Sequence, residues 1–314
     1  FRRAARRAIG GAMELFDHQT RSIRAPRVKK LLPSADFLFA RAAEGIADRI
    51  DDVKRDFPRA AIVGAGGGAF TEALRGRLGR EKLLQVESAP DLAALAAARA
   101  PEAETLAAPE EDLPLEQGAY DAIIGGMTLH RVNDPVGLLT QMRLALKPDG
   151  LLLAAMFGGR TLHELRAAFA EAEAEVEGGV SPRVAPMGEV RDLGGLLQRA
   201  GFALPVADVD RFEVTYTTPF HLMRDLRAMG EANALTQRRK SFSRRATFMR
   251  MAEIYAANFS RPDGRVTATF EVVFLTGWSP DASQPQPLRP GSAKTSLADA
   301  LGTVEKSAGE KAGK

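Results

Sequence analysis

A glycine-rich loop lies between a short apolar run and a helical pattern at residues 61–78. Ala61-Ile62-Val63 predicts a buried strand, Gly64-Ala65-Gly66-Gly67-Gly68 follows it, and Thr71 to Leu78 has helical spacing. Glycines let the backbone approach a ligand closely, and the start of the following helix favours polar or negative groups. This order of strand, loop and helix predicts a nucleotide-like binding site, although tight packing alone would also explain the glycines.

The chain continues this alternation beyond the glycine loop. Further strands are predicted at 83–86, 120–124 and 151–156, and helices at 91–100 and 135–146. Strands that alternate with helices at this spacing form a mostly parallel sheet with helices on both faces. We therefore predict an α/β fold with a doubly wound, Rossmann-like sheet.

The segments after residue 157 predict additions to that sheet. Thr161 and Glu164 have the spacing of a capping box, which predicts a helix that begins after Thr161. The later patterns predict helices at 190–200, 219–229 and 245–258 and strands at 209–217 and 266–275. We expect a helical lid and two late strands, with a late antiparallel strand in the sheet.

Charge and composition divide the chain into three parts. The net charge is +3, but residues 1–30 hold nine basic and two acidic side chains, so the remainder carries −4. We predict a basic arm at 1–30, one domain at 31–278 with its core at 60–156 and its lid and late strands at 157–278, and an extended or disordered proline-rich tail at 279–314. Because the basicity belongs to the arm, it gives no argument for nucleic acid as a partner.

Composition also excludes several kinds of site. The chain has no cysteine and four histidines, which rules out disulfides, thiolate zinc sites and protein-bound iron–sulfur clusters, and we expect no metal site. No apolar run approaches the roughly 20 residues that cross a bilayer. We expect no integral membrane segment, while peripheral contact with a membrane stays open.

The first thirteen residues contain four arginines and no acid. This composition suits a mitochondrial presequence. Translation that starts at Met13 in a GC-rich bacterial genome would explain the same residues. We favour the bacterial cytoplasm as the location, with the mitochondrial matrix as the alternative.

Acidic side chains follow the glycine loop at the spacing of a nucleotide site. Glu87 ends the next strand, 19 residues after Gly68, where doubly wound folds place an acid against the ribose hydroxyls. The loop has the spacing G-x-G-x-G, which favours S-adenosylmethionine over NAD as the cofactor. The candidate cofactor-binding residues are Gly64, Gly66, Gly68, Glu87, Glu110 and Glu111.

His130 is the candidate catalytic residue. It follows the strand predicted at 120–124, at the edge where parallel sheets bind ligands, and could act as a general base. A histidine whose nitrogens are satisfied by neighbouring backbone is the alternative interpretation.

Residues 60–156 resemble class I S-adenosylmethionine-dependent methyltransferases, a group that includes the malonyl-carrier-protein methyltransferase of biotin synthesis. The resemblance lies in the glycine loop, Glu87, the segment 110–114 and Lys147-Pro148-Asp149-Gly150. The segments 156–166, 177–182 and 222–233 are similar to one subfamily, the methyltransferase-like assembly factor of respiratory complex I. That family has a mitochondrial member that hydroxylates an arginine of the quinone-proximal iron–sulfur subunit.

The resemblance implies a protein client, a complex I iron–sulfur subunit, and modification of its arginine. A conventional methyltransferase that acts on a small molecule or a carrier protein is the second hypothesis. Three positions depart from the family pattern: Ile62 replaces an acid, Pro109 stands where an adenine-binding aspartate is expected, and Arg131 replaces an aromatic residue. These losses predict weakened cofactor binding, and a non-catalytic assembly chaperone is therefore the third hypothesis.

Overall fold

The computed structural model describes residues 14–285, 298 and 302–304. The chain divides into two compact units, Phe1–Pro280 and Asp281–Lys314, and the fold described below is that of the first. The predictions for the first thirteen residues, and for most of the tail at 279–314, lie outside the described residues.

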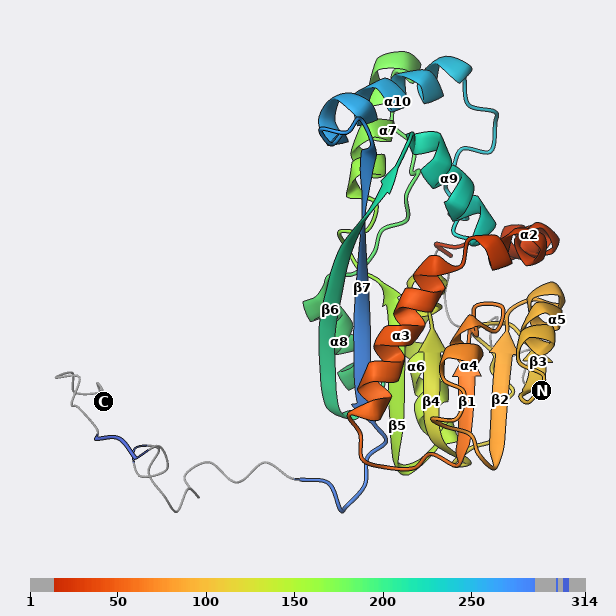
Figure 1. The fold of residues 1–314 in the computed structure, drawn as a ribbon, viewed down its shortest axis with the longest axis vertical. Coiled ribbons are helices and arrows are strands. Elements are labelled where there is room, and N and C mark those ends of the chain that lie inside the picture. The colour runs from red at the N-terminus through yellow and green to blue at the C-terminus, as the bar shows by residue number, and fades with distance from the viewer. Residues whose placement is uncertain (1–13, 286–297, 299–301, 305–314) are drawn as a thin grey trace. The chain divides into compact units, whose positions relative to one another are not determined.

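Within the described residues, seven strands form one mixed sheet (Figure 1). Its order is β3 (Glu104–Ala107), β2 (Lys82–Glu87), β1 (Arg59–Val63), β4 (Tyr120–Gly126), β5 (Leu146–Phe157), β7 (Val266–Trp278) and β6 (Ala203–Tyr216). The first five strands are parallel, and β7 runs antiparallel to both β5 and β6. The predicted fold class is confirmed, and the short, half-exposed edge strand β3 is an element that the sequence patterns missed.

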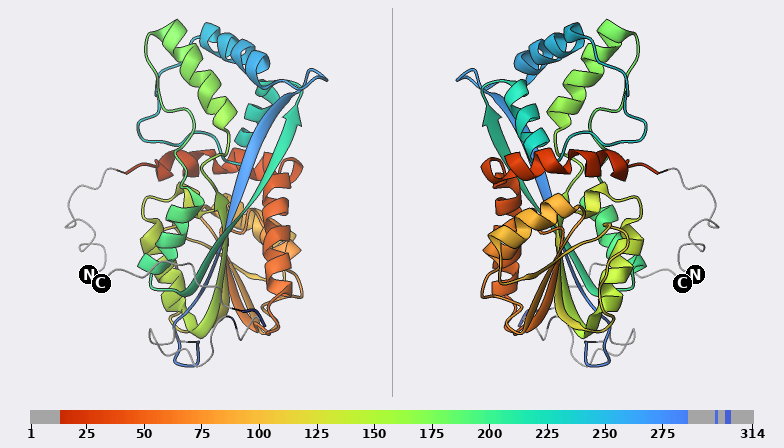
Figure 2. Two further views of the ribbon diagram at one scale, coloured as in Figure 1. Left: turned by 90° about the vertical axis from the view of Figure 1, so that its left-hand side faces the viewer. Right: turned by 90° about the vertical axis from the view of Figure 1, so that its right-hand side faces the viewer.

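Helices cover both faces of the sheet because the buried strands are apolar on both sides. Ala60 and Ile62 of β1 pack toward α3 (Phe37–Asp51), whereas Ala61 and Val63 belong to the core that includes α6 (Pro135–Ala145) and α8 (Val190–Arg199). Figure 2 shows α3 on one side of the sheet and α6 and α8 on the other.

The glycine loop leads into a shorter helix than its pattern predicted. The helix α4 (Ala69–Ala73) is five residues long, and turns follow it. Gly76 and Gly79 both have positive φ in these turns, which is a conformation that glycine adopts readily and a helix does not contain. The helix α5 (Pro90–Arg99) agrees with its prediction within one residue. It lies on the same face of the sheet as α4.

A lid stands on the long strands β6 and β7, which extend past the carboxyl ends of the parallel strands (Figures 1 and 2). Its helices are α7 (His163–Glu177), α9 (Pro219–Ala228) and α10 (Arg245–Phe259). The helix α2 (His18–Leu31), which no pattern predicted, lies between the lid and the sheet. Within the described residues, no helix combines the length and apolar character that crossing a bilayer requires.

The predicted capping box at Thr161 and Glu164 is wrong. The helix α7 begins at His163, and the Thr161 hydroxyl instead donates to the Glu271 carbonyl and accepts from the Glu271 N–H, both at 3.0 Å. The Glu164 carboxylate accepts a hydrogen bond from the Thr269 N–H at 3.0 Å. Both side chains therefore join α7 to β7, because the neighbouring strand offers backbone groups that a capping box would leave unused.

We expect Thr161→Val to destabilise the protein by about 1–3 kcal/mol. The side chain is fully buried, and valine has a similar shape but leaves the Glu271 N–H without that hydrogen bond. Urea unfolding measures the change in the free energy of unfolding. Thr161→Ser keeps the hydroxyl and is the control; equal midpoints for the valine variant and the wild type would contradict the assignment.

Candidate active site

The glycine loop lies at the carboxyl end of β1, as predicted. Gly64 has φ +75°, and a Cβ at this position would lie 1.9 Å from the Thr128 hydroxyl oxygen, so the close approach to the end of β4 requires glycine. The Gly67 N–H donates to the Glu87 carboxylate at 2.7 Å. The structure thus brings Gly64, Gly66, Gly68 and Glu87 together at one edge of the sheet.

Glu87 is buried at the end of β2. Burial raises the pKa of Glu87 to about 7, although the hydrogen bond from the Gly67 N–H acts in the opposite direction. Protonated and ionised forms of Glu87 are therefore both populated at neutral pH. A carboxyl group in this position can accept from ribose hydroxyls when it turns away from the loop.

Glu110 is held by two arginines. Arg21 of α2 contacts its two carboxylate oxygens at 2.6 and 3.0 Å, and Nε of Arg131 lies 3.3 Å from Oε1. Burial opposes ionisation of Glu110, but the two guanidinium groups outweigh it and keep the pKa of Glu110 below its ordinary value. In this arrangement Glu110 is an ionised partner of α2.

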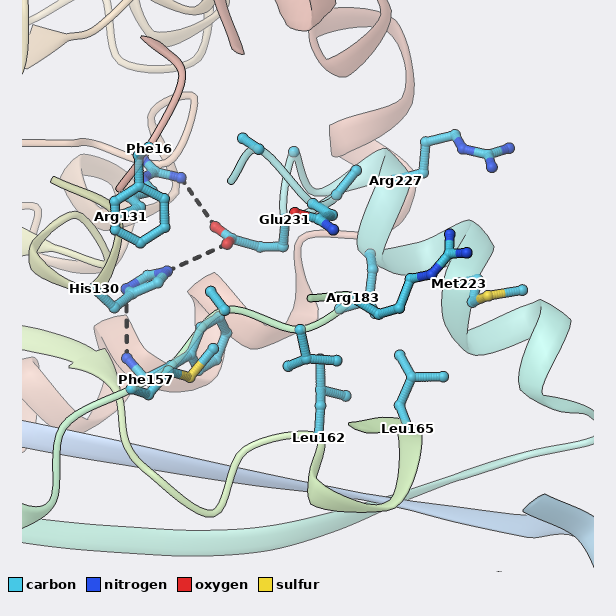
Figure 3. A pocket seen from close by; sticks show the side chains of 18 of the residues that line it. Phe16, His130, Arg131, Phe157, Leu162, Leu165, Arg183, Met223, Arg227 and Glu231 are labelled. Atoms are coloured by element: carbon cyan, nitrogen blue, oxygen red, sulfur yellow. Dashed lines mark hydrogen bonds and ion pairs between the residues drawn. The ribbon is translucent and has the colours of Figure 1, made fainter. Parts of the chain in front are cut away.

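The same chain of charges continues to Glu231 (Figure 3). Arg131 Nη1 donates to Glu231 Oε1 at 2.9 Å, and His130 Nε2 lies 3.2 Å from Glu231 Oε2. Burial by itself would raise the pKa of Glu231. His130 and Arg131 have the larger, opposite effect, so the pKa lies below its ordinary value and the carboxyl is ionised at neutral pH. Glu231 follows α9, and this contact therefore fastens the lid to the loop after β4.

Both ring nitrogens of His130 have partners. Nδ1 accepts from the Phe157 N–H at 3.5 Å, which leaves the proton on Nε2, the nitrogen that faces Glu231. Burial lowers the pKa of His130, and Glu231 only partly offsets this effect. The ring is thus a neutral donor that orients Glu231, and it must release a partner before it can act as a base.

Glu111 binds the N-terminal segment instead of lying free for a ligand. Its carboxylate lies 3.3 Å from His18 Nε2 and accepts from the Asn133 N–H. Asn133 in turn pairs through its side chain with both backbone groups of Phe16, at 2.8 and 3.2 Å. These contacts hold the residues before α2 against the loop after β4.

Two cavities flank this set of charges. The lid cavity, of about 210 Å³, has mostly apolar walls that include Phe157, Leu162 and Met223 (Figure 3). The edge cavity, of about 530 Å³, is lined by residues that include Ser88, Pro109, Glu110 and Glu111. Arg21, Arg131 and Gly230 line both cavities, whereas the glycines at 64, 66 and 68 line neither.

Sequence reasoning missed Arg21 and Glu231. Arg21 lay in the segment interpreted as a basic arm, and nothing local indicates that its side chain is buried. Glu231 lay in the family-like segment 222–233, which was the available signal.

Ile62, which replaces the family's acid, is a fully buried core residue of β1. Within the described part of the chain, no group of three histidine, aspartate or glutamate side chains is arranged to hold a metal ion.

Comparisons with known proteins agree with this architecture. The model of the methyltransferase domain family matches residues 62–154. A crystal structure of a Bacillus halodurans C-125 protein assigned as a methyltransferase has a TM-score of 0.53 at 14% identity, covering 76% of this chain and 99% of that one. At this identity the likeness shows the fold alone.

Curated relatives extend the match over the lid. The mitochondrial arginine-hydroxylase NDUFAF5 of Danio rerio is 37% identical over 289 residues, which cover 91% of this chain and 89% of the relative. The human protein is 38% identical, covering 86% and 77%. The malonyl-[acyl-carrier protein] O-methyltransferase of Laribacter hongkongensis is 33% identical, covering 76% and 81%. On this evidence the chain belongs to the family of the arginine-hydroxylase NDUFAF5 and has the methyltransferase fold.

Proposed function

We propose that this protein hydroxylates an arginine side chain of a client protein during the assembly of respiratory complex I. The observation that carries the proposal is the similarity to arginine-hydroxylases, which includes the lid as well as the core. The client that the family resemblance suggests is the quinone-proximal iron–sulfur subunit. Hydroxylation inserts an oxygen atom into a C–H bond, so the reaction also consumes an oxidant.

The edge cavity suits the nucleoside part of S-adenosylmethionine. Glu110 and Glu111 line this cavity, and Glu87 directly precedes its lining residue Ser88 in the chain. Their carboxylates are acceptors for ribose hydroxyls and for the adenine amino group. Ile62 offers no acceptor to the amino group of the methionine part, whereas Arg21 and Arg131 could bind its carboxylate. A bound cofactor would supply an electrophilic methyl group on a sulfonium ion, which serves the methyltransferase hypothesis; hydroxylation does not use this methyl group and takes its oxygen atom from the oxidant.

The chain's own residues prepare the lid cavity for a side chain. Phe157, Leu162, Leu165 and Met223 exclude water from its walls. His130 donates to Glu231 and thereby orients that carboxylate toward the cavity. In this proposal His130 is a positioning residue, and the hypothesis that it is a general base requires its Nδ1 to release the Phe157 N–H first.

The relatives support this proposal over a carrier-protein methyltransferase. The arginine-hydroxylases match at 36–39% identity and cover up to 92% of the chain, compared with 31–33% identity for the malonyl-carrier-protein enzymes. We further propose that the protein works in the mitochondrial matrix, the location that its mitochondrial relatives favour; the bacterial cytoplasm stays the prediction from composition.

We expect Glu87→Gln to weaken S-adenosylmethionine binding by about 10- to 100-fold, because a hydrogen bond to a charged group contributes about 1.5–3 kcal/mol. The wild-type affinity should fall as the pH decreases through about 7, since protonation of Glu87 removes the stronger, ionised acceptor. The glutamine variant should lack this dependence. Isothermal titration calorimetry measures both effects.

Glu102→Gln is the matched control, because Glu102 is an exposed carboxylate 2.6 Å from Arg75 and far from the cavity walls. It should bind the cofactor as the wild type does. Wild-type protein that binds its client tightly but shows no affinity for S-adenosylmethionine would support the non-catalytic chaperone instead.

Deletion of the gene should abolish hydroxylation of the client arginine. Mass spectrometry of the iron–sulfur subunit should then find the arginine peptide lighter by one oxygen atom, and the wild-type gene should restore the mass. An unchanged peptide mass in the deletion strain would refute the proposed function. A peptide lighter by CH2, the net mass that one methylation adds, would favour a methyltransferase.

A further inference from the structure

Glu231 is the only acid among the described residues that line the lid cavity. Its side chain is 12% exposed, and its carboxylate points toward Arg131 and His130, whereas Leu162 and Met223 lie on the other side of the cavity (Figure 3). The cavity therefore offers one anionic group at the end of an apolar chamber. Such a chamber matches a ligand with an apolar stem and a cationic head.

The carboxylate of Glu231 already binds one guanidinium group. Arg131 Nη1 donates to Oε1 at 2.9 Å, and the neutral His130 donates to Oε2. An ionised carboxylate has about four acceptor positions, so these two bonds leave capacity for further donors. Glu231 can thus receive a second guanidinium without losing the hydrogen bond from His130.

Glu231 is not the sole ionic partner of Arg131 among the described residues. Its Nε lies 3.3 Å from Glu110, an acid that Arg21 also contacts. If Arg131 withdraws from Glu231, it keeps an ionic partner on its other side. Exchange of one guanidinium for another at Glu231 therefore leaves no buried charge uncompensated, which would otherwise be strongly destabilising.

The two other arginines of the lid cavity do not prevent a cation from entering. Arg183 is paired with the buried Glu173, which also accepts from Ser181. Arg227 is exposed, so water and salt screen its charge. Among the lining residues that the structure describes, Glu231 alone forms the anionic end of the cavity.

We propose that Glu231 receives the guanidinium group of the client's arginine, and that Arg131 occupies this position in the free protein. The inference rests on the proposed function because it takes arginine as the modified residue. It makes Glu231 the residue that determines specificity for arginine over uncharged side chains of the same shape.

The test uses small probes on the full-length protein. N-acetyl-arginine amide and N-acetyl-citrulline amide have similar shapes, but citrulline is uncharged. Ligand-observed NMR at millimolar probe concentrations should show that the wild type prefers arginine by about tenfold or more. Glu231→Gln, with folding checked by circular dichroism, should lose this preference, and Glu175→Gln, which removes an exposed charge on α7, should retain it.

A second variant tests the exchange at Glu231. Arg131→Gln removes the internal guanidinium and should strengthen binding of N-acetyl-arginine amide severalfold, a gain that a merely structural role for Arg131 does not produce. Weaker binding by an Arg131→Gln variant that circular dichroism shows to be folded would overturn the inference. A wild-type protein without preference for arginine would also overturn the inference, and so would a Glu231→Gln variant that retains the preference.

Failure of this inference and failure of the proposed function have different signatures. If Glu231 determines arginine binding but the client peptide is unchanged in the deletion strain, the site is supported and the function is refuted. If the deletion strain loses the modification while a strain with Glu231→Gln modifies its client fully, the function stands and the role of Glu231 is refuted.

Discussion

Two largely buried guanidinium groups and two largely buried carboxylates form a continuous series of ion pairs, from Arg21 through Glu110 and Arg131 to Glu231. Removal of one member of such a set leaves an uncompensated buried charge, which typically costs about 3–5 kcal/mol. These ion pairs join α2, the loop after β4 and the segment after α9. These four side chains therefore help to hold the lid, which stands on β6 and β7, in its position above the sheet.

The ion pairs also divide the space above the sheet. Arg21 and Arg131 line both the edge cavity and the lid cavity, so their side chains form the boundary between a polar groove beside Glu110 and an apolar chamber beside Glu231. In the proposed function, the polar groove binds the nucleoside of the cofactor and the apolar chamber binds the side chain of the client. A ligand that contacts either arginine would alter the charge balance on both sides.

Most of the fold could be predicted, because strands and helices of the core follow from local periodicity. The strands at 83–86 and 120–124 were found because apolar runs of this length are buried on both faces of a parallel sheet. Short or half-exposed elements such as β3 lack that signal. The capping box at Thr161 failed for a different reason, since its donors and acceptors found partners on β7, more than 100 residues later.

The sequence by itself determined the glycine loop, the acid at the end of β2 and the sheet edge where they meet, because these depend on short-range spacing and on the parallel order of the strands. Only the tertiary structure decided which partners Glu110 and His130 have. Arg21 is 89 residues from Glu110, and Glu231 is 101 residues from His130. Charge pairing over such separations depends on how α2 and the lid pack on the sheet, and no local pattern encodes it.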